Sequence, residues 1–433
     1  MKKHFALYLI SCLSIFGCQP KQQSLDLNQL ATEYVKTCLT IGQYDTDFVD
    51  AYYGPDSLKP ITKIDSIFPK EVLLDELSNL RNQLSSFDVT TEEQDRKAYL
   101  IAQITASEER VRIFSGETTD FDTESQRLFG VTAPHYPITH YDSLINELSL
   151  ILPGSGTVND RFQSLSKHFI IPPSKIDTLF KTAIQMARDD SKRHFILPSE
   201  ENFSIAYVSD KPWSGYNWYQ GHYQSKIQIN TDFPIAIERV LDVGSHESYP
   251  GHHVYNMLLE KNLYRDKGYV ETSLYPLFSP QSFIAEGSAN YGIEMVFPEN
   301  IKLPFTAQKL LPLAGIDTTG LHTYFKALHI AEQLNYINNE VARGLFSETL
   351  DENQAVQLLI SYGLYSPEKA KQRLGFIQKY RSYVINYNYG KDLVKSAVAS
   401  SKDQWESFRY LLSHQILPVT LQQKKTRFLE ASH

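Results

Sequence analysis

The sequence predicts a mainly α-helical protein with one small β-sheet. Apolar residues recur with helical spacing along most of the chain, and only residues 203–230 are rich in aromatic and β-forming residues. With 42% hydrophobic and 21% charged residues among 433, the composition is that of an ordinary globular chain. No internal repeat or low-complexity linker is visible. We therefore expect one large domain over residues 27–433, with a helical part (27–200) and a part that carries the functional site (201–433).

The first residues have the features of an export signal. A positively charged start precedes an apolar stretch, residues 5–16, that is too short to span a bilayer. It ends in Ile15-Phe16-Gly17-Cys18, which resembles a lipidation signal with a bulky Phe16. We expect residues 1–18 to be a lipoprotein signal peptide and 19–26 a polar tether. Cys18 would then anchor the protein to a membrane of the cell envelope, on the periplasmic or outer-membrane face. In the alternative, a secretory signal is cut elsewhere and Cys18 is incidental.

The charge and the cysteine content argue against a nucleic-acid-binding protein and against a fold held by disulfides. A formal net charge of -8, with no run of Lys or Arg, argues against nucleic acid as a partner. Of the three cysteines, Cys12 lies in the signal and Cys18 is the lipidation candidate, so Cys38 stands alone in an apolar helical stretch. We expect a buried, inert thiol there and no disulfide in the folded part.

Helix signals recur along the chain. Thr91 with two glutamates after it opens one helix, and Ser366-Pro367-Glu368 supplies an N-cap, a first-turn proline and an early acid for another. A strand is predicted at 225–230, where Ile227 and Ile229 alternate onto one face, and a helix follows from near Pro234. The other predicted helices cover residues 27–42, 70–86, 91–115, 174–194, 280–297, 317–346, 352–361 and 402–415.

The helix after Pro234 leads into the motif His246-Glu247-Ser248-Tyr249-Pro250-Gly251-His252-His253. It is a zinc-peptidase HExxH pattern with two extra residues. On a straight helix, six residues separate two side chains by about 9 Å and about 120°, so His246 and His252 could not reach one ion. Pro250 breaks the helix, and Gly251 permits a positive-φ turn. We expect the helix to end or bulge between 249 and 251 and to return His252 to the metal.

A catalytic zinc ion usually has three protein ligands. Glu286 fits best as the third, since the small residues around it would let its helix pack closely against the histidine helix. Glu247 is then the general base that activates a zinc-bound water. His253 is a candidate alternative ligand, an outer partner of the ligands, or a hydrogen-bonded helix residue. In the alternative to a metal site, the histidines form a merely structural cluster.

These residues resemble a bacterial family known as domain of unknown function 885, whose hallmark is HExxPGHH and which is similar to zinc metallopeptidases. The resemblance implies a multi-helix, zinc-hydrolase-like fold, with the small sheet beside the metal-binding helix. It covers nearly the whole mature chain, although the hydrolytic role of the family is itself mainly inferred. Further segments that carry the resemblance are Ile41–Asp45, Val49–Pro55, Lys211–Gly221, Ile229–Asp232, Glu286–Ala289 and Tyr387–Pro418.

Several residues are candidates for contact with the substrate. Tyr387 stands where the family pattern has a tyrosine and could stabilise an oxyanion or simply pack, and Arg381 could hold a substrate carboxylate. The strand at 225–230 could pair by a free edge with an extended peptide. Tyr216, Trp218, Ile227 and Ile229 would then contact the substrate; otherwise strand and rings are buried in the core.

The leading hypothesis is a hydrolase with one zinc ion, most readily a metallopeptidase acting on peptides outside the cytoplasm. A non-catalytic envelope lipoprotein with a residual metal site is the second hypothesis, and a zinc enzyme for a non-peptide amide or ester is the third. The intact Glu247 favours catalysis, because a metal-binding scaffold needs no base beside its first ligand.

Overall fold

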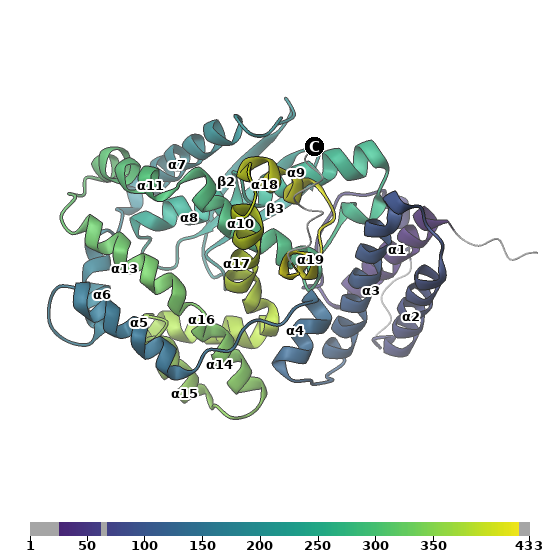
Figure 1. Cartoon of the computed structure of the whole chain (residues 1–433), viewed down its shortest axis with the longest axis horizontal. Helices are drawn as coiled ribbons and strands as arrows, with labels where there is room; N and C mark the ends of the chain where they lie inside the picture. The colour runs from purple at the N-terminus through teal and green to yellow at the C-terminus, as the bar shows by residue number, and fades with distance from the viewer. Residues whose placement is uncertain (1–25, 62–66, 424–433) are drawn as a thin grey trace, which may run out of the picture.

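The computed structural model describes residues 26–61 and 67–423. Within these ranges the protein is mainly helical, as predicted, with short strands in two small sheets (Figure 1). The predicted signal peptide, Cys18 and nearly all of the tether lie outside the described residues. No helix of the described ranges combines the length and apolarity that a membrane crossing needs.

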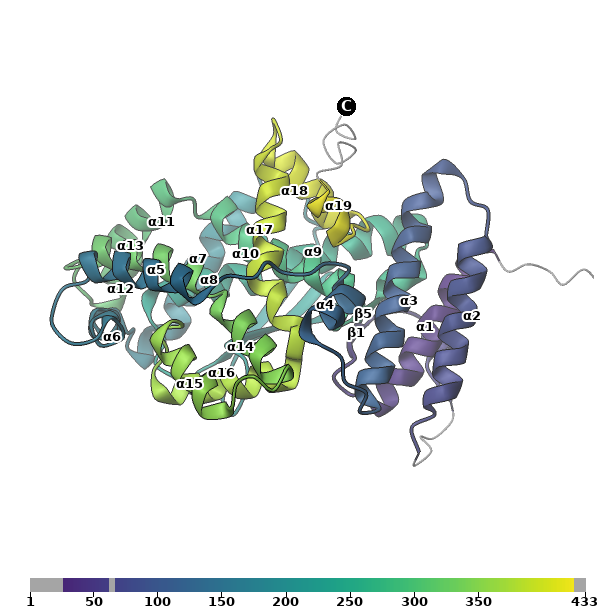
Figure 2. The ribbon, with the colours of Figure 1, turned by 60° about the horizontal axis from the view of Figure 1, so that its bottom comes forward.

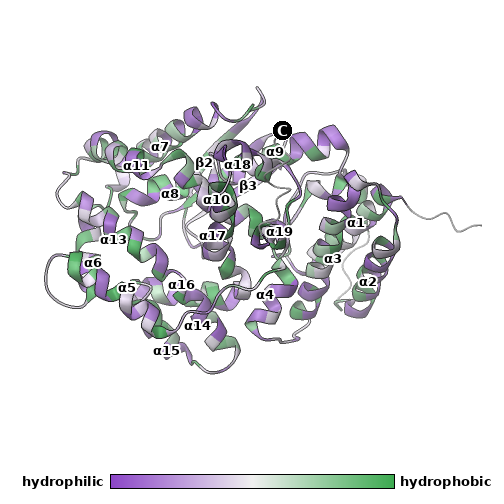
Figure 3. Cartoon of the chain, viewed as in Figure 1, coloured by the Kyte–Doolittle hydropathy of each residue, from purple (hydrophilic) through white to green (hydrophobic). Residues whose placement is uncertain are grey.

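Most helices carry polar residues on one face and apolar residues on the other, which is visible as mixed colouring along each ribbon (Figure 3). Their bounds are α1 Leu27–Tyr44, α2 Lys70–Ser86, α3 Gln94–Phe114, α4 Phe121–Phe129, α5 Ile138–Ile151, α6 Val158–His168, α7 Ile176–Ser191, α8 Ile237–Glu247, α9 His252–Leu259, α10 Pro280–Val296, α11 Glu299–Phe305, α12 Leu311–Ala314, α13 Leu321–Leu334, α14 Ile337–Phe346, α15 Glu352–Ser361, α16 Pro367–Tyr380, α17 Ile385–Ala399, α18 Gln404–Ser413 and α19 Pro418–Gln422.

The expected helices are present, with differences at their ends. Ser366 caps α16 as predicted, since its side chain accepts a hydrogen bond from the backbone of Lys369. The segment predicted as one helix over 317–346 is two, because α13 ends at Leu334 and α14 begins at Ile337. The sequence pattern did not single out α4, α5 and α6, which lie between 121 and 168, nor α11, α12, α17 and α19.

The strands form two sheets rather than the one predicted. β1 (Val49–Tyr52) pairs antiparallel with β5 (Leu274–Pro276). In the other sheet, β4 (Gln224–Asn230) lies between β2 (Asn202–Val208), which is parallel to it, and β3 (Gly215–Gly221), which is antiparallel. The first sheet escaped prediction because its strands are short and far apart in sequence.

Two hydrophobic clusters hold the fold together. The smaller one joins α1, α2 and α3, which lie side by side at one end of the molecule (Figure 2). Cys38 belongs to it and is fully buried, so the predicted burial is confirmed, and this burial raises the pKa of the thiol to about 12. The larger cluster runs from Phe121 to Leu421 and includes the helices and strands around the histidine motif.

The packing of α10 on α17 sets the framework of the site. A Cβ at Gly287 would lie 2.5 Å from the backbone of Gly390, so glycine is what allows these two helices to approach so closely. Farther along α10, a Cβ at Gly292 would lie 2.9 Å from the ring of Pro250 in the histidine motif. The small residues therefore do permit close packing as expected, but the closest contact is with α17 rather than with the histidine helix.

Candidate metal centre

The histidine motif is built on a helix that breaks after Glu247. α8 ends at Glu247 and α9 begins at His252, so the predicted interruption is confirmed. The predicted positive φ at Gly251 is wrong, since its φ is -76°. A Cβ at this position would lie 1.8 Å from the carbonyl oxygen of His246. Glycine is thus required by the close approach of two backbone segments, and that approach returns His252 to His246.

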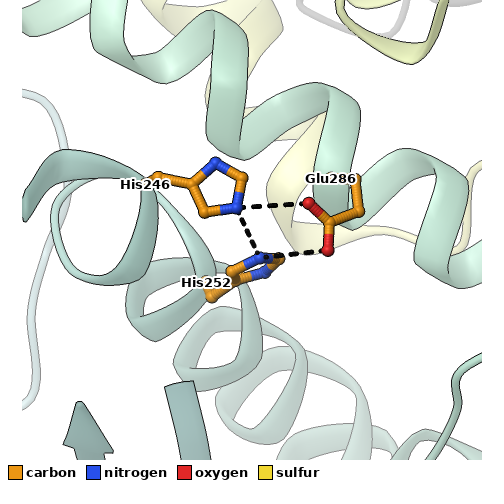
Figure 4. A group of neighbouring side chains, drawn as sticks. All are labelled: His246, His252 and Glu286. Carbon is orange, nitrogen blue, oxygen red and sulfur yellow. Dashed lines mark hydrogen bonds and ion pairs between the residues drawn. The ribbon is translucent and has the colours of Figure 1, made fainter. Parts of the chain in front are cut away.

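The turn brings both histidines together with Glu286 of α10 (Figure 4). Nε2 of His246 lies 3.0 Å from Nε2 of His252 and 3.2 Å from Oε2 of Glu286, and Nε2 of His252 lies 3.5 Å from Oε1 of Glu286. Atoms about 2.1 Å from a tetrahedral zinc ion are roughly 3.4 Å apart. Within residues 26–61 and 67–423, this is the sole cluster of three such side chains with ligand spacing.

The two carboxylate oxygens of Glu286 have different surroundings. Oε1 accepts a hydrogen bond of 2.8 Å from the hydroxyl of Tyr383. Oε2 is buried and receives no hydrogen bond from any described residue. A buried carboxylate oxygen without a hydrogen bond is costly. A cation at this position would satisfy it, and two imidazoles with one carboxylate form a donor set that suits zinc.

The other side of the His246 ring is fixed by Asn290. Nδ1 of His246 lies 3.0 Å from Oδ1 of Asn290, and Nδ2 of Asn290 donates to the carbonyl oxygen of Tyr387 at 2.9 Å. Because the amide nitrogen is engaged by that carbonyl, the amide oxygen must face His246, so Nδ1 carries the proton. When the ring is neutral, the lone pair of Nε2 is then free for a metal, which is the arrangement found in histidine ligands.

The charges of the cluster favour a cation. Burial opposes the charged form of His246, but its contact with Glu286 and the charge of Glu247 raise its pKa to about 9. Burial also opposes the ionised form of Glu286, yet His252 and His246 hold the pKa of its carboxyl well below the usual range. The carboxylate of Glu286 therefore stays ionised beside the two imidazoles. Its negative charge stabilises a positive charge placed between the three side chains.

Glu247 lies beside this cluster in a cavity of about 2150 Å³, which is also lined by both cluster histidines, Glu286 and Tyr387. The backbone carbonyl of Glu247 accepts a hydrogen bond of 2.6 Å from Asn217 of β3. Its side-chain carboxylate has no hydrogen-bond or ion-pair partner among the described residues. Burial raises the pKa of this carboxyl, as does Glu286, while His246 and His252 oppose the shift. The group is thus held in place by its backbone and free at its side chain.

Tyr387 lies at the cluster, as the sequence suggested. Its ring stacks against that of His246, with 6.4 Å between ring centroids and 23° between ring planes. Burial, and then the charge of Glu286, raise the pKa of its hydroxyl well above the usual range. The hydroxyl therefore keeps its proton and can act as a hydrogen-bond donor towards the cavity.

Three functional candidates were missed by the sequence reasoning. Asn290 follows Glu286 by four residues, and Tyr383 precedes Tyr387 by four, so helical spacing from the chosen residues would have found both. Asp50, on β1, lines the cavity, and burial followed by the charges of Glu286 and Glu247 raises its pKa to about 8. No local signal reveals Asp50, because its strand reaches the site only through pairing with β5.

His253 faces away from the cluster. It is fully buried, its Nε2 lies 3.1 Å from Oε2 of Glu201, and its Nδ1 lies 2.8 Å from Oγ of Ser225. The alternatives of a metal ligand and of an outer partner to the ligands are therefore wrong, and the remaining one, a hydrogen-bonded helix residue, describes it. Consecutive residues on a helix point about 100° apart, so His252 and His253 serve different surroundings.

Arg381 does not reach the cavity either. Its Nε donates to Oε2 of Glu124 at 2.6 Å, and its guanidinium lies over the ring of Phe346. With its charge paired and its side chain mostly buried, it is not available to a substrate carboxylate. The prediction failed because sequence proximity to Tyr387 does not fix the direction of a side chain at the junction before α17.

The expected free edge of the strand at 225–230 is absent, since β4 is paired on both sides. Ile227 and Ile229 are fully buried, and only Ile229 borders the cavity. Trp218 is 43% exposed, donates from its indole to Gln228 and does not line the cavity. Tyr216 does line it. The strand beside Glu247 with one unpaired edge in this sheet is β3, not β4.

The comparisons with known proteins show a similarity of fold and nothing further. No family model and no curated protein matches the sequence. A solved structure from Colwellia psychrerythraea, named as a candidate lipoprotein, shares 14% identity over 83% of this chain, with a TM-score of 0.53. Another from Shewanella oneidensis, named as a candidate lipoprotein of unknown function, shares 12% identity over 81% of this chain, with a TM-score of 0.49. The chain spans 66% and 71% of those two chains. The resemblance to the domain of unknown function 885 stays a prediction.

Proposed function

We propose that this protein is an envelope lipoprotein with a zinc hydrolase centre, ligated by His246, His252 and Glu286. One observation carries the proposal. Two imidazole nitrogens and Oε2 of Glu286, which lacks a hydrogen bond, converge in a cavity beside Glu247, whose side-chain carboxylate has no partner among the described residues. A bound zinc ion would acidify water and polarise a carbonyl group at this place.

The chain's own residues would divide the remaining work. Glu247 accepts a proton from the attacking water and passes it to the leaving nitrogen, a role that suits a carboxyl whose pKa is raised by burial. Tyr387 donates a hydrogen bond to the oxyanion. Asn290 and Tyr383 orient His246 and Glu286 through their hydrogen bonds.

Peptides are the substrate class that this arrangement suits best, with other amides or esters as the chemical alternative. The cavity is lined by polar and aromatic side chains, including Tyr216 and Trp213. The N-terminal lipidation motif, together with the candidate lipoprotein whose fold is similar, supports a location in the cell envelope.

A non-catalytic lipoprotein that binds a metal is the second candidate. The structural comparison supports it better than the first, because the name of the similar protein mentions a lipoprotein and no activity. The two candidates differ in what they require of Glu247, which is dispensable in a binding protein and essential in a hydrolase.

The deciding experiment is the variant Glu247→Gln, assayed with a mixed peptide library. We expect zinc stoichiometry and thermal stability to be kept, and peptide cleavage to fall about 10³-fold, because a general base contributes in that range. Glu299→Gln is the matched control, since Glu299 is an exposed carboxylate that also lines the cavity. Cleavage that survives in Glu247→Gln would remove the mechanism. Zinc binding without cleavage of any amide or ester by the unmodified protein would favour the second candidate.

A further inference from the structure

Three cationic side chains lie on one wall of the cavity, near the proposed metal centre. Arg239 comes from α8, while Lys369 and Arg373 come from α16. Lys369 and Arg373 are four residues apart and share one helical face. Arg239 precedes His246 by seven residues, two helical turns, so it lies on the same face of α8 as the metal cluster. We call Arg239, Lys369 and Arg373 the cationic wall.

Protein carboxylates leave the cationic wall largely unneutralised. Several other cations of the cavity are paired: Lys302 with Asp242, and Lys391 and Lys395 with Glu294. Within the described residues, by contrast, neither member of the wall on α16 forms an ion pair. Arg239 approaches Asp242 only at 3.9 Å, and Asp242 already binds Lys302 at 3.1 Å.

The contacts that the wall does make leave donors free. Nε of Arg373 donates to Oδ1 of Asn338 at 2.8 Å, and its guanidinium lies 4.7 Å from the ring centroid of Phe376. The ammonium of Lys369 lies 5.7 Å from the ring centroid of Phe233. These contacts fix the two stems while the terminal nitrogens of Arg373 and the ammonium of Lys369 remain available to a ligand.

The wall acts electrostatically on the metal centre and on itself. Burial, and then the charge of Arg239, lower the pKa of Lys369, while the charge of Glu238 opposes the shift only in part, so like charges stand close together in a partly enclosed place. The charge of Arg239 reaches Glu247, and that of Arg373 reaches Tyr387. Like charges gathered in this way are unfavourable until an anion lies between them.

We propose that Arg239, Lys369 and Arg373 form the subsite for the C-terminal carboxylate of a peptide whose scissile bond lies at the metal centre. This inference rests on the proposed function and narrows it to cleavage near the C-terminus. Guanidinium groups match a carboxylate with two parallel hydrogen bonds, and a lysine adds a point charge. The wall takes the role that the sequence assigned to Arg381.

The dimensions limit the length of the released product. The two turns between Arg239 and His246 span about 10 Å along α8. An extended peptide rises about 3.3 Å per residue. A carboxylate held at the wall therefore belongs to a residue about three positions beyond the scissile bond, and the enzyme releases short C-terminal fragments.

The test measures binding separately from cleavage. The zinc-loaded Glu247→Gln protein is titrated with fluorescent hexapeptides that have neutral side chains and end either in a free acid or in an amide. We expect the acid to bind about tenfold to a hundredfold more tightly than the amide, as charge-assisted hydrogen bonds allow. Adding Lys369→Gln and Arg239→Gln should bring the ratio close to one. Adding Lys371→Gln, the same change on α16 at a residue outside the cavity, should leave the ratio unchanged.

The outcomes separate the subsite from the proposed function. Equal binding of acid and amide overturns the subsite, and so does equal tight binding of an amide with glutamate as its last residue, because the anion would then be a side chain. A preserved acid preference in a protein that cleaves no peptide leaves the subsite standing and removes the hydrolase. Cleavage of the acid and the amide with equal kcat/KM would support the hydrolase and remove the subsite. Lys369→Arg, which keeps the charge, should keep the preference and so guards against a folding artefact.

Discussion

Two glutamate–histidine clusters lie on opposite sides of the same turn, and they differ in what they leave unsatisfied. Glu286 faces His246 and His252 in the cavity, and its Oε2 has no hydrogen-bond partner among the described residues. Glu201 faces His253 in the core, where Tyr249 donates to Oε2 and Arg188 donates to Oε1. Both clusters contain the same kinds of side chain.

The type of a residue alone therefore does not make it a metal ligand. His253 uses both ring nitrogens on Ser225 and Glu201, and it is fully buried. His246 uses only Nδ1 on Asn290 and presents Nε2 to an open cavity. A metal site needs lone pairs that the protein has left unpaired and a path for the ion. By this criterion the first cluster is suited to hold a metal ion, whereas the second cluster, which we call the brace, is satisfied by the protein itself.

Separate replacement of the two neighbouring histidines should give the largest difference between the clusters. His252→Ala removes one of three ligands, so we expect purified protein to lose its stoichiometric zinc, as measured by elemental analysis. His253→Ala should keep the stoichiometric zinc, although its free energy of unfolding should be lower. If His253→Ala lost zinc while His252→Ala retained it, the assignment of the two clusters would be reversed.

The brace should respond in stability rather than in metal content. Glu201→Gln leaves Arg188 without its buried carboxylate and weakens the bond to His253, and breaking a buried pair typically costs about 3–5 kcal/mol. We expect urea denaturation to show a loss in this range, with zinc stoichiometry unchanged. Glu200→Gln, at an exposed neighbouring position, is the control and should change the stability by less than about 0.5 kcal/mol. A fully stable Glu201→Gln variant would contradict the structural role.

The sequence indicated the cluster of His246, His252 and Glu286, but it did not indicate the contacts of His253 in the brace. The six-residue spacing with Pro250 and Gly251 forced a break in the helix, and that break identified His252. Glu201 and Ser225 contact His253 across 52 and 28 residues of chain, so no local pattern links them. The same limit hid Asp50 and misdirected Arg381, because a side chain's direction depends on tertiary packing.

The helices were predicted well for a related reason. Their apolar spacing and caps are local, as the N-cap of α16 at Ser366 illustrates. The sheets were not, since β4 received the expected alternation but its place between two partners depends on β2 and β3. Local chemistry thus predicted the elements, and only the fold determined which strand keeps an open edge.

Acid should weaken the brace in a defined window. Burial opposes the ionised form of Glu201, but hydrogen bonds from His253, Tyr249 and Arg188 lower its pKa to about 2. A carboxyl whose pKa is depressed on folding adds stability above its unfolded pKa of about 4.5 and loses it as the pH falls towards the folded value. Between pH 5 and pH 3 the unfolding free energy should therefore fall by about 2 kcal/mol more than in Glu201→Gln. Parallel pH profiles of the two proteins would contradict the depressed pKa.

The smallest expected effect tests how the open cluster is oriented. Asn290→Ala removes the acceptor that holds the proton on Nδ1 of His246 and turns Nε2 towards the metal. Partners of this kind typically contribute about ten- to hundredfold in metal affinity. We expect the lower end, about tenfold, because a neutral amide oxygen is a weaker acceptor than a carboxylate. Competition with a chelator measures the change, and Asn290→Asp should retain or strengthen binding because its carboxylate accepts the same proton. If Asn290→Ala held zinc as tightly as the unmodified protein, the orientation of His246 would depend on its stacking with Tyr387 rather than on this hydrogen bond.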